Sequence, residues 1–330
     1  MIQNKNVFGE LTELHVHVGS AVDPHIMWEI AHEQGIRLPT KNYWEFKELI
    51  TVSGVTTYDK YLDLFHWTEL IQSSPEAMQR SIYSIASGAY RKNNITTLEI
   101  RFNPMKRNRG GERDLDHIIL SAIHGMEKAM LAFPIKAGLI FCFDRGYSQK
   151  LNSIIAQKAI KYQRRGVVGV DLAGQIAKGF DIASLTNMVS DCKQAGLGIT
   201  IHTGEVTDSN EMLRVIKLLS PDRIGHGIRS VEENKVLDEI KRRGIVLEVC
   251  PSSNVHTGVV KNLSDFKDIF SKMKESGVSF TINTDGPEML KTNLINEYNQ
   301  LLDKGILDKK DLELALKNAQ AATFIKHEPI

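Results

Sequence analysis

The sequence is poor in cysteine, and the three cysteines that it has are far apart. Cys142, Cys192 and Cys250 are odd in number, and none belongs to a Cys-x-x-Cys pair. A disulfide framework needs an even set of cysteines, so the sequence excludes the small disulfide-stapled class of secreted proteins. Free thiols are typical of a reducing compartment, and we therefore expect a cytoplasmic protein.

Long apolar runs are also lacking. No stretch approaches the ~18 consecutive apolar residues of a membrane-spanning helix. Residues 1–6 (MIQNKN) contain no apolar segment of the kind found in a secretory signal peptide. We therefore expect neither a membrane anchor nor a signal peptide.

Charge of neither sign is in excess. The chain has 41 basic and 40 acidic residues, which gives a formal net charge of +1. Electrostatic capture of nucleic acid or of an anionic membrane needs a basic excess, so the balance argues against both as partners. With 25% charged and 42% hydrophobic residues, the composition is that of a globular protein. No long exposed apolar face is apparent, and the oligomeric state stays open.

Short β-rich apolar runs recur along the chain and alternate with amphipathic segments. Segments such as 153–163 and 210–219 repeat apolar residues at the three- and four-residue spacing of a helix. Strands that alternate with helices imply parallel pairing, and eight such units favour a closed (β/α)₈ TIM barrel, an α/β fold, over an open sheet. No internal repeat or linker divides residues 1–330, so one domain is expected. The predicted strands are 11–18, 95–102, 135–143, 166–172, 197–202, 223–226, 245–250 and 278–283.

A helical insertion at about residues 22–92 interrupts this alternation after the first strand. About 75 residues separate the first two strands, far more than one crossover helix needs. We expect several helices that form a cap over one mouth of the barrel. The alternative is a helical embellishment that only buries core. Aromatic residues concentrate in this insertion, namely Trp28, Trp44, Tyr58, Tyr61, Phe65 and Trp67.

Polar side chains collect at the ends of several predicted strands. His15 and His17 end the first strand, His202 the fifth, His226 the sixth, and Asp285 follows the eighth. Taken singly, each histidine has the alternative of a hydrogen-bonded core residue, and Asp285 that of a turn residue before Gly-Pro. A TIM barrel brings the carboxyl ends of all its strands to one rim, which is where such enzymes place the active site.

Three histidines and one carboxylate on this rim would suit a divalent transition metal, zinc before others. We assign His15, His17, His202 and Asp285 as the ligands of one Zn²⁺ per chain, with water completing the shell. The metal would lower the pKa of that water toward ~7, making hydroxide available at neutral pH. His226 is then placed as a base, and Glu205, three residues after His202, as the general acid.

The same residues resemble the motifs of the adenosine deaminase family, within the metal-dependent amidohydrolases. The matching segments follow the family's order along the whole chain: ELHVH (13–17), GVDLAG (169–174), HTGE (202–205), RIGHG (223–227), LEVCPSSNVHTG (247–258) and NTDGP (283–287). The resemblance implies a zinc-dependent hydrolytic deamination, in which zinc-bound hydroxide attacks C6 of a 6-aminopurine nucleoside such as adenosine and ammonia leaves.

The resemblance also assigns roles to single residues. It implies that Glu205 acts at purine N1, that His226 orients the hydroxide, and that Asp285 accepts a proton as well as binding the metal. The backbone at Gly174 would contact purine N3, where a glycine allows the ring to come close. A protonated carboxyl at N1 would stabilise the charge that attack at C6 pushes onto that nitrogen.

Two positions depart from the family pattern. Gly19 and Gly286 stand where the family usually has aspartates, which serve the ribose hydroxyl side and purine N7. The deamination chemistry is expected to remain, while the substrate stays open because each lost contact removes ~1–3 kcal/mol. The room left by Gly19 is compatible with a 5′-modified nucleoside. The candidates for replacing the lost contacts are Ser20, His25, Asn254 and His256.

Two other functions remain as alternatives. A binuclear amidase or phosphoester hydrolase on the same barrel often uses a carboxylated lysine at the fourth strand end to bridge its metals. Residues 171–174 (DLAG) contain no lysine. The second alternative is a non-enzymatic barrel that keeps its metal and binds a nucleoside. Glu205 argues against that function, because a purely structural metal site gains nothing from an acid that does not bind the metal.

Overall fold

The computed structural model describes residues 8–108 and 114–326 of the chain. Residues 1–7 lie outside this description, so the prediction that residues 1–6 contain no signal-peptide segment falls outside the described residues. Within the described ranges, we find no helix that combines the length and the apolar content needed to cross a bilayer.

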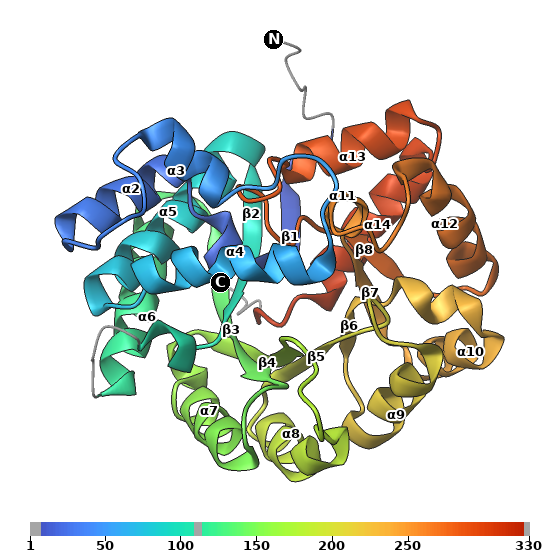
Figure 1. Ribbon diagram of the computed structural model, residues 1–330. Coiled ribbons are helices and arrows are strands. Elements are labelled where there is room, and N and C mark those ends of the chain that lie inside the picture. The colour runs from blue at the N-terminus through green and yellow to red at the C-terminus, as the bar shows by residue number, and fades with distance from the viewer. Residues whose placement is uncertain (1–7, 109–113, 327–330) are drawn as a thin grey trace.

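Eight parallel strands form the centre of the molecule and follow one another around it in sequence order (Figure 1). The ring closes where the backbone N–H of His17 donates to the carbonyl of Asp285 and the N–H of Asp285 donates to the carbonyl of His15, both at 2.9 Å. The predicted (β/α)₈ barrel is confirmed. The strands are β1 (Leu11–His17), β2 (Ile95–Phe102), β3 (Lys136–Asp144), β4 (Val167–Ala173), β5 (Gly198–Thr203), β6 (Arg223–His226), β7 (Val246–Val249) and β8 (Phe280–Ile282).

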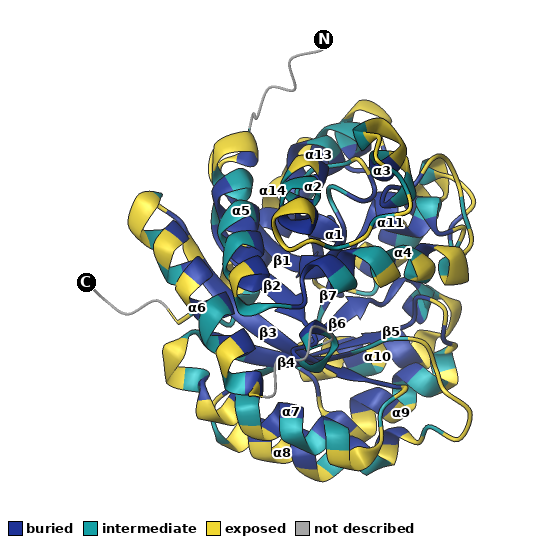
Figure 2. Cartoon of the chain, turned by 60° about the vertical axis from the view of Figure 1, so that its left-hand side comes forward, coloured by how far each residue is buried: buried dark blue, intermediate teal, exposed yellow. Residues whose placement is uncertain are grey.

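Helices surround the strands on the outside, and their outward faces carry most of the exposed residues (Figure 2). The α-helices are α1 (Val18–Ala21), α2 (Pro24–Glu33), α3 (Tyr43–Leu49), α4 (Tyr58–Ile71), α5 (Pro75–Asn93), α6 (Leu115–Ala132), α7 (Gln149–Lys161), α8 (Thr186–Gln194), α9 (Ser209–Leu219), α10 (Asn234–Arg243), α11 (Pro251–His256), α12 (Phe266–Glu275), α13 (Leu294–Asp303) and α14 (Lys309–Ala322). Short 3₁₀ helices are η1 (Met105–Arg107), η2 (Gln163–Arg165), η3 (Ile182–Leu185), η4 (Ile228–Glu232) and η5 (Leu263–Asp265).

The two faces of the strands differ in chemistry. Side chains that point outward, such as Leu98 and Ile100 of β2, pack with the surrounding helices in one apolar core. Directly after Ile100, β2 carries Arg101 on its other face, which is fully buried and pairs with acidic side chains of other strands across the barrel. Since successive side chains of a strand alternate between its faces, the same strands supply both an apolar coat and a charged interior.

The insertion after β1 contains α1 to α5, and α4 lies across the mouth of the barrel (Figure 1). Tyr58, Tyr61 and Phe65 of α4 line the cavity beneath it, and the cap stays a prediction. The rest of the insertion fits the alternative: Trp28 packs against the core, and α5 serves as the crossover helix beside β2 and α6. Trp44 takes part in neither, because 67% of its surface is exposed.

The predicted strand ends are right to within a few residues. The first strand ends one residue earlier than predicted, because Val18 already belongs to α1. The eighth is the most shortened, from residues 278–283 to Phe280–Ile282. In these two strands the pairing stops before the apolar pattern does, because the chain already turns away from the sheet.

Candidate active site

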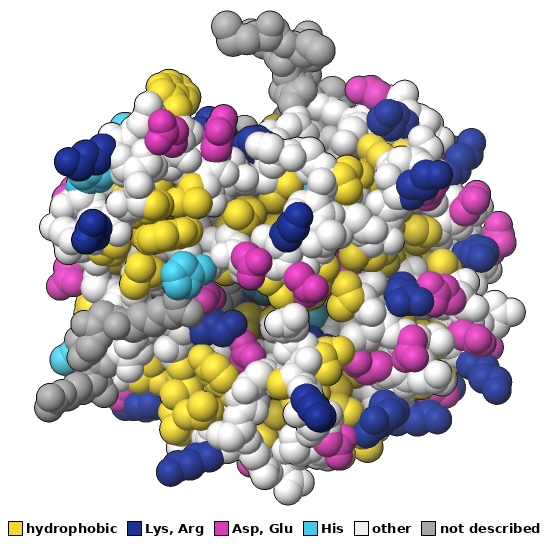
Figure 3. Space-filling model, viewed as in Figure 1, with side chains coloured by type: hydrophobic (Ala, Val, Ile, Leu, Met, Phe, Trp, Pro, Cys, Tyr) yellow, Lys and Arg dark blue, Asp and Glu magenta, His cyan; other side chains and the backbone are white. Residues whose placement is uncertain are grey.

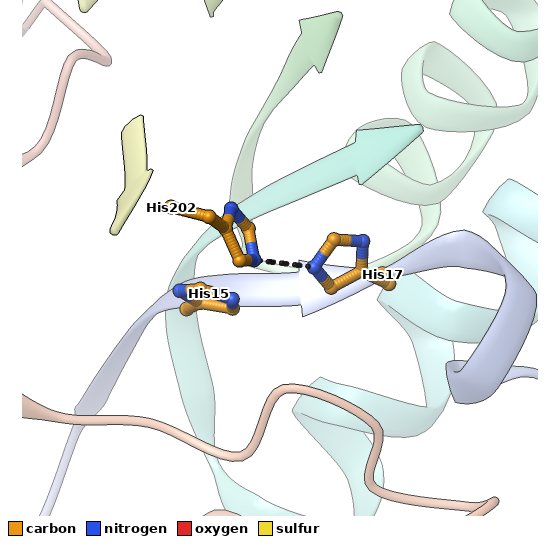
Figure 4. Close-up of side chains that lie close together, drawn as sticks. All are labelled: His15, His17 and His202. Atoms are coloured by element: carbon orange, nitrogen blue, oxygen red, sulfur yellow. Dashed lines mark hydrogen bonds between the residues drawn. The ribbon is translucent and has the colours of Figure 1, made fainter. Parts of the chain in front are cut away.

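Three imidazoles face one another at the carboxyl ends of the strands (Figure 4). His15 and His17 share one face of β1 because they are two residues apart on a strand, and His202 comes from β5. The Nε2 atoms of His17 and His202 are 3.2 Å apart. The ring centroids of His15 and His202 are 4.6 Å apart.

Buried carboxylates hold two of these rings in place. Glu248 of β7 accepts a hydrogen bond from Nδ1 of His15 at 2.7 Å, and Asp171 of β4 accepts one from Nδ1 of His202 at 2.8 Å. With each Nδ1 engaged as a donor, each Nε2 is left as a lone pair that points toward the other histidines. Burial also lowers the pKa of His15 and His17, which favours the neutral rings that a metal binds.

Arg101 of β2 links the two carboxylates beneath the histidines. Its guanidinium donates to Asp171 at 3.0 Å and to Glu248 at 2.8 Å, and Arg223 donates to Glu248 at 2.6 Å. Burial acts to raise the pKa of Glu248, but the two arginines outweigh it and lower this pKa to about 2. Both carboxylates are therefore ionised when they orient the rings.

Asp285 approaches the histidines from the segment after β8, in the left-handed backbone region at φ 62°. Its Oδ1 lies 3.4 Å from Nε2 of His17 and 3.7 Å from Nε2 of His15. Its Oδ2 accepts hydrogen bonds from Ser253 at 2.6 Å and from Tyr61 at 3.4 Å. One carboxylate oxygen is thus held by hydroxyl groups, while the other faces the imidazoles.

Glu13 ties the two ends of the barrel ring together behind these residues. Its carboxylate accepts hydrogen bonds from the backbone N–H of His15 at 3.1 Å and from the hydroxyl of Thr284 at 2.9 Å. Thr284 directly precedes Asp285, so one buried side chain of β1 braces the backbone on both sides of the ring closure.

Glu205 and His226 lie beside this cluster and are linked by Asn254. The amide nitrogen of Asn254 is 3.2 Å from Oε1 of Glu205 and 3.1 Å from Nδ1 of His226. Burial raises the pKa of Glu205 to about 8, with the nearby charge of Asp285 adding to the effect. Burial lowers the pKa of His226 to about 3. At neutral pH Glu205 is therefore mostly a neutral acid, and His226 is a neutral imidazole.

The arrangement of these donors fits a divalent metal ion. Nε2 of His15 is buried and has no hydrogen-bond partner among the described residues, although buried ring nitrogens are normally paired. It points toward the same place as Nε2 of His17, Nε2 of His202 and Oδ1 of Asp285. Three neutral imidazoles and a carboxylate around one point form a donor set that suits zinc and leaves room for water. Ligand atoms of His15, His17 and His202 all lie within 4.8 Å of one another.

A cavity of about 370 Å³ opens above the cluster and is covered by α4. Figure 3 shows the hollow in the same view as Figure 1, with charged and histidine side chains around its edge. Its floor includes His17, His202, Glu205, His226 and Asp285. The other walls are formed by Gly19, Tyr58, Asp59, Tyr61, Leu62, Asp63, Phe65, His66, Glu69, Arg101, Phe102, Asn103, Lys106, Arg107, Cys142, Phe143, Asp144, Ala173, Gly174 and Gln175.

The space beside Gly19 is filled, which corrects the expectation that this glycine leaves room for a 5′-modified nucleoside. A Cβ at this position would lie 2.6 Å from Cδ1 of Phe65 and 3.3 Å from Nη2 of Arg107. The aromatic ring comes from α4 and the guanidinium from η1. The cap therefore uses the volume that the missing side chain would have taken.

Gly286 has a similar surrounding. A Cβ there would lie 2.8 Å from Oγ of Ser20 and 2.9 Å from the hydroxyl of Tyr61. Of the four candidate replacements, Ser20 is at this glycine and Asn254 is between Glu205 and His226. His25 and His256 do not line the cavity.

Gly174 lies at the cavity wall just after β4, at φ 88°, where a side chain would be strained. The carboxylate of Asp144, at the end of β3, is 2.9 Å from the place of a Cβ on this glycine. Neither Asp144 nor Tyr61 is predicted from the sequence as a site residue. Arg101, Asp171 and Glu248 were also missed, although charged residues inside apolar strand segments were a signal for them.

Comparison with known proteins agrees with this geometry. The family model described as adenosine deaminase matches residues 11–329. An adenosine deaminase from Clostridium kluyveri is 30% identical over 320 residues, which cover 97% of this chain and 90% of the relative.

Solved structures share the fold at lower identity. An adenine deaminase from Arthrobacter aurescens superposes with a TM-score of 0.85 at 20% identity, covering 96% of this chain and 94% of the other. An amidohydrolase from Burkholderia ambifaria with bound Zn has a TM-score of 0.81 at 19% identity, covering 99% and 89%. The match of a family model over nearly the whole chain shows that this protein is an aminohydrolase and belongs to the adenosine deaminase family.

Proposed function

We propose that this protein hydrolyses the 6-amino group of adenosine or a related 6-aminopurine nucleoside, yielding the inosine-type product and ammonia, with one Zn²⁺ per chain. The observation that carries the proposal is the convergence of His15, His17, His202 and Asp285 beneath a cavity that is lined by the last three of them and by the buried acid Glu205. A small purine substrate fits a cavity of about 370 Å³, which is within the usual range for small-molecule sites.

The proposed zinc ligands are His15, His17, His202 and Asp285. Support comes from the unpartnered Nε2 of His15, from the carboxylates behind His15 and His202, and from the zinc in the structure of the Burkholderia amidohydrolase. When bound, the ion lowers the pKa of a coordinated water toward ~7 and so supplies a nucleophile at neutral pH.

The protein side chains would handle the protons. Glu205, held in its acid form by burial, donates to purine N1 as attack at C6 pushes electrons onto that nitrogen. His226 is neutral and adjacent, so it would orient the attacking water, and Asp285 would accept a proton. The backbone at Gly174 is open to contact with purine N3.

A substrate panel tests the proposal. Purified protein is incubated with adenosine, 2′-deoxyadenosine, AMP and adenine, and ammonia release is measured together with the change from an adenine to a hypoxanthine spectrum. We expect turnover of at least one nucleoside, its loss after chelation, and its recovery with Zn²⁺. A protein that turns over none of these compounds after zinc loading would contradict the proposal.

Metal analysis separates the proposal from the binuclear alternative. We expect one equivalent of metal per chain, because Asp171, the carboxylate at the end of β4, is already engaged by His202 and Arg101. Two equivalents would favour the binuclear hydrolase. The cytoplasmic location and the oligomeric state remain open to experiment.

A further inference from the structure

The order of strands around the barrel places the sugar of a bound nucleoside. If Glu205, after β5, contacts N1 and Gly174, after β4, contacts N3, the purine edge runs from β5 toward β4. N9 follows N3 along that edge and carries the sugar. Because β3, β2 and β1 continue the ring beyond β4, the sugar lies over the ends of these three strands. This placement rests on the function proposed above.

Asp144 is the carboxylate at this part of the rim. It is the last residue of β3, it lines the cavity, and only 7% of its surface is exposed. Its oxygens lie 2.9 to 3.0 Å from the place of a Cβ on Gly174, so they are next to the wall proposed for N3. In α1, directly after β1, Gly19 offers no side chain to a sugar.

The carboxylate of Asp144 is held rigidly on both sides. Oδ1 accepts a hydrogen bond from the backbone N–H of Gly146 at 2.7 Å, and Oδ2 pairs with Nζ of Lys106 at 2.7 Å. Its backbone N–H and carbonyl are both bonded to the side-chain amide of Asn152 at 3.0 Å. A fixed carboxylate can accept hydrogen bonds from neighbouring hydroxyls at little entropic cost, as pre-organised sites do.

The negative charge of Asp144 favours a neutral sugar over an anionic group beside it. Besides its floor, the cavity is lined by the carboxylates Asp59, Asp63, Glu69 and Asp144 and by the cations Arg101, Lys106 and Arg107. Lys106 already pairs with Asp144, and the nearby charge of Glu69 also acts on it. A phosphate oxygen has no proton to donate to this carboxylate, whereas hydroxyl groups donate readily to it.

We infer that Asp144 reads the sugar of the substrate: its carboxylate accepts hydrogen bonds from the 2′- and 3′-hydroxyls of a 6-aminopurine ribonucleoside, and Lys106 positions it. The substrate class is therefore a ribonucleoside, in preference to a deoxynucleoside or the free base. Asp144, at the end of β3, supplies a carboxylate in place of the aspartate that the family pattern has at the position of Gly19.

Asp144→Asn tests the inference, since it keeps the shape of the side chain and removes its charge. The kcat/KM values for adenosine, 2′-deoxyadenosine and 3′-deoxyadenosine are compared in the full chain. Wild-type protein is expected to prefer adenosine by roughly tenfold or more over at least one deoxynucleoside, as for a hydrogen bond to a charged group. In the variant this preference should disappear through a loss on adenosine. Asp191→Asn, at an exposed position of α8 outside the cavity, should keep it.

Binding of the product provides a readout without turnover. Calorimetry with inosine and 2′-deoxyinosine should show the same loss of discrimination in Asp144→Asn. If Asp144→Asn does not fold, Lys106→Gln is used instead, because it keeps the carboxylate of Asp144 but removes the cation that pairs with it. This variant should reduce the preference for adenosine over the deoxynucleosides. An unchanged preference in Lys106→Gln would then overturn the inference.

The outcomes separate the inference from the function on which it rests. Equal use of all three nucleosides by the wild-type protein, or an equal loss on all three in Asp144→Asn, overturns the inference alone. If the wild-type protein deaminates none of them, the proposed function fails and the inference falls with it.

Discussion

The floor and the roof of the cavity are built in different ways. The floor consists of side chains at strand ends, such as His17 and His202, and His15 is buried beside them. The carboxylates and arginines beneath fix the orientation of His15 and His202. The roof consists of α4, whose Tyr61 and Phe65 fill the places that side chains at Gly286 and Gly19 would need. The floor is a rigid hydrogen-bonded network, whereas the roof is a packing arrangement of one helix. We therefore expect substitutions on the floor to affect the chemical step, and substitutions in the walls and roof to affect the choice of substrate.

The largest expected effect is on the floor. Glu205→Gln removes the acidic proton while keeping the size of the side chain, and we expect kcat to fall by about 10²–10⁴-fold. Metal content, measured by atomic absorption, should not change, because Glu205 is outside the proposed ligand set. The exposed Glu232→Gln serves as the control. Full turnover by Glu205→Gln would show that the acid lies elsewhere.

The network beneath the floor is tested by Asp171→Asn. This change removes the charge that orients His202, and such partners typically contribute 10–100-fold to metal affinity. We therefore expect zinc affinity, measured by competition with a chelator, to fall by roughly that factor. The exposed Asp191→Asn on α8 should bind zinc normally. If Asp171→Asn binds zinc as tightly as the wild type, the buried network has no part in holding the metal.

The packing of the roof is tested at Gly19. Gly19→Ala places a methyl group against Phe65, and we expect it to lower the free energy of unfolding by about 1–3 kcal/mol. In a Phe65→Ala background the same change should cost clearly less, because the two sites are in contact. Urea denaturation of the four proteins measures the coupling. Equal costs in both backgrounds would contradict the assigned contact.

The smallest effect is expected for Tyr61, whose hydroxyl lies against Gly286. The hydroxyl of Tyr61 occupies the place of a side chain at position 286, where the family pattern puts the group that addresses purine N7. Tyr61→Phe should lower kcat/KM for adenosine by roughly 2- to 10-fold, as for one neutral hydrogen bond. With 7-deazaadenosine, which lacks the N7 acceptor, the two proteins should be equal. An equal loss of kcat/KM on both substrates would show that the hydroxyl acts through its hydrogen bond to Asp285 instead.

Much of the floor was predictable because it follows local rules. The alternation of side chains on β1 puts His15 and His17 on one face, and a barrel brings the end of β5 to the same rim. The (β/α)₈ fold and the family were both predicted and are confirmed by the strand order and the family match. The roles of the site residues remain predictions, although the structure brings these residues together.

The walls and roof were not predictable in the same way. Gly19 was expected to leave space, yet Phe65, 46 residues further along, fills it. Asp144 lies at the end of an apolar strand and has no motif of its own, and its proximity to Gly174 follows only from the pairing of β3 with β4. Contacts of this kind depend on how an inserted helix packs, which periodicity does not encode.

The sequence by itself therefore determined the barrel and the family, and it predicted which side chains reach the rim, because strand periodicity and order along the chain specify them. Only the tertiary structure decided what surrounds the substrate. Because protein interiors are closely packed, the space beside a glycine is filled by a side chain that can come from far along the chain. One sequence position alone therefore does not show whether that space is free.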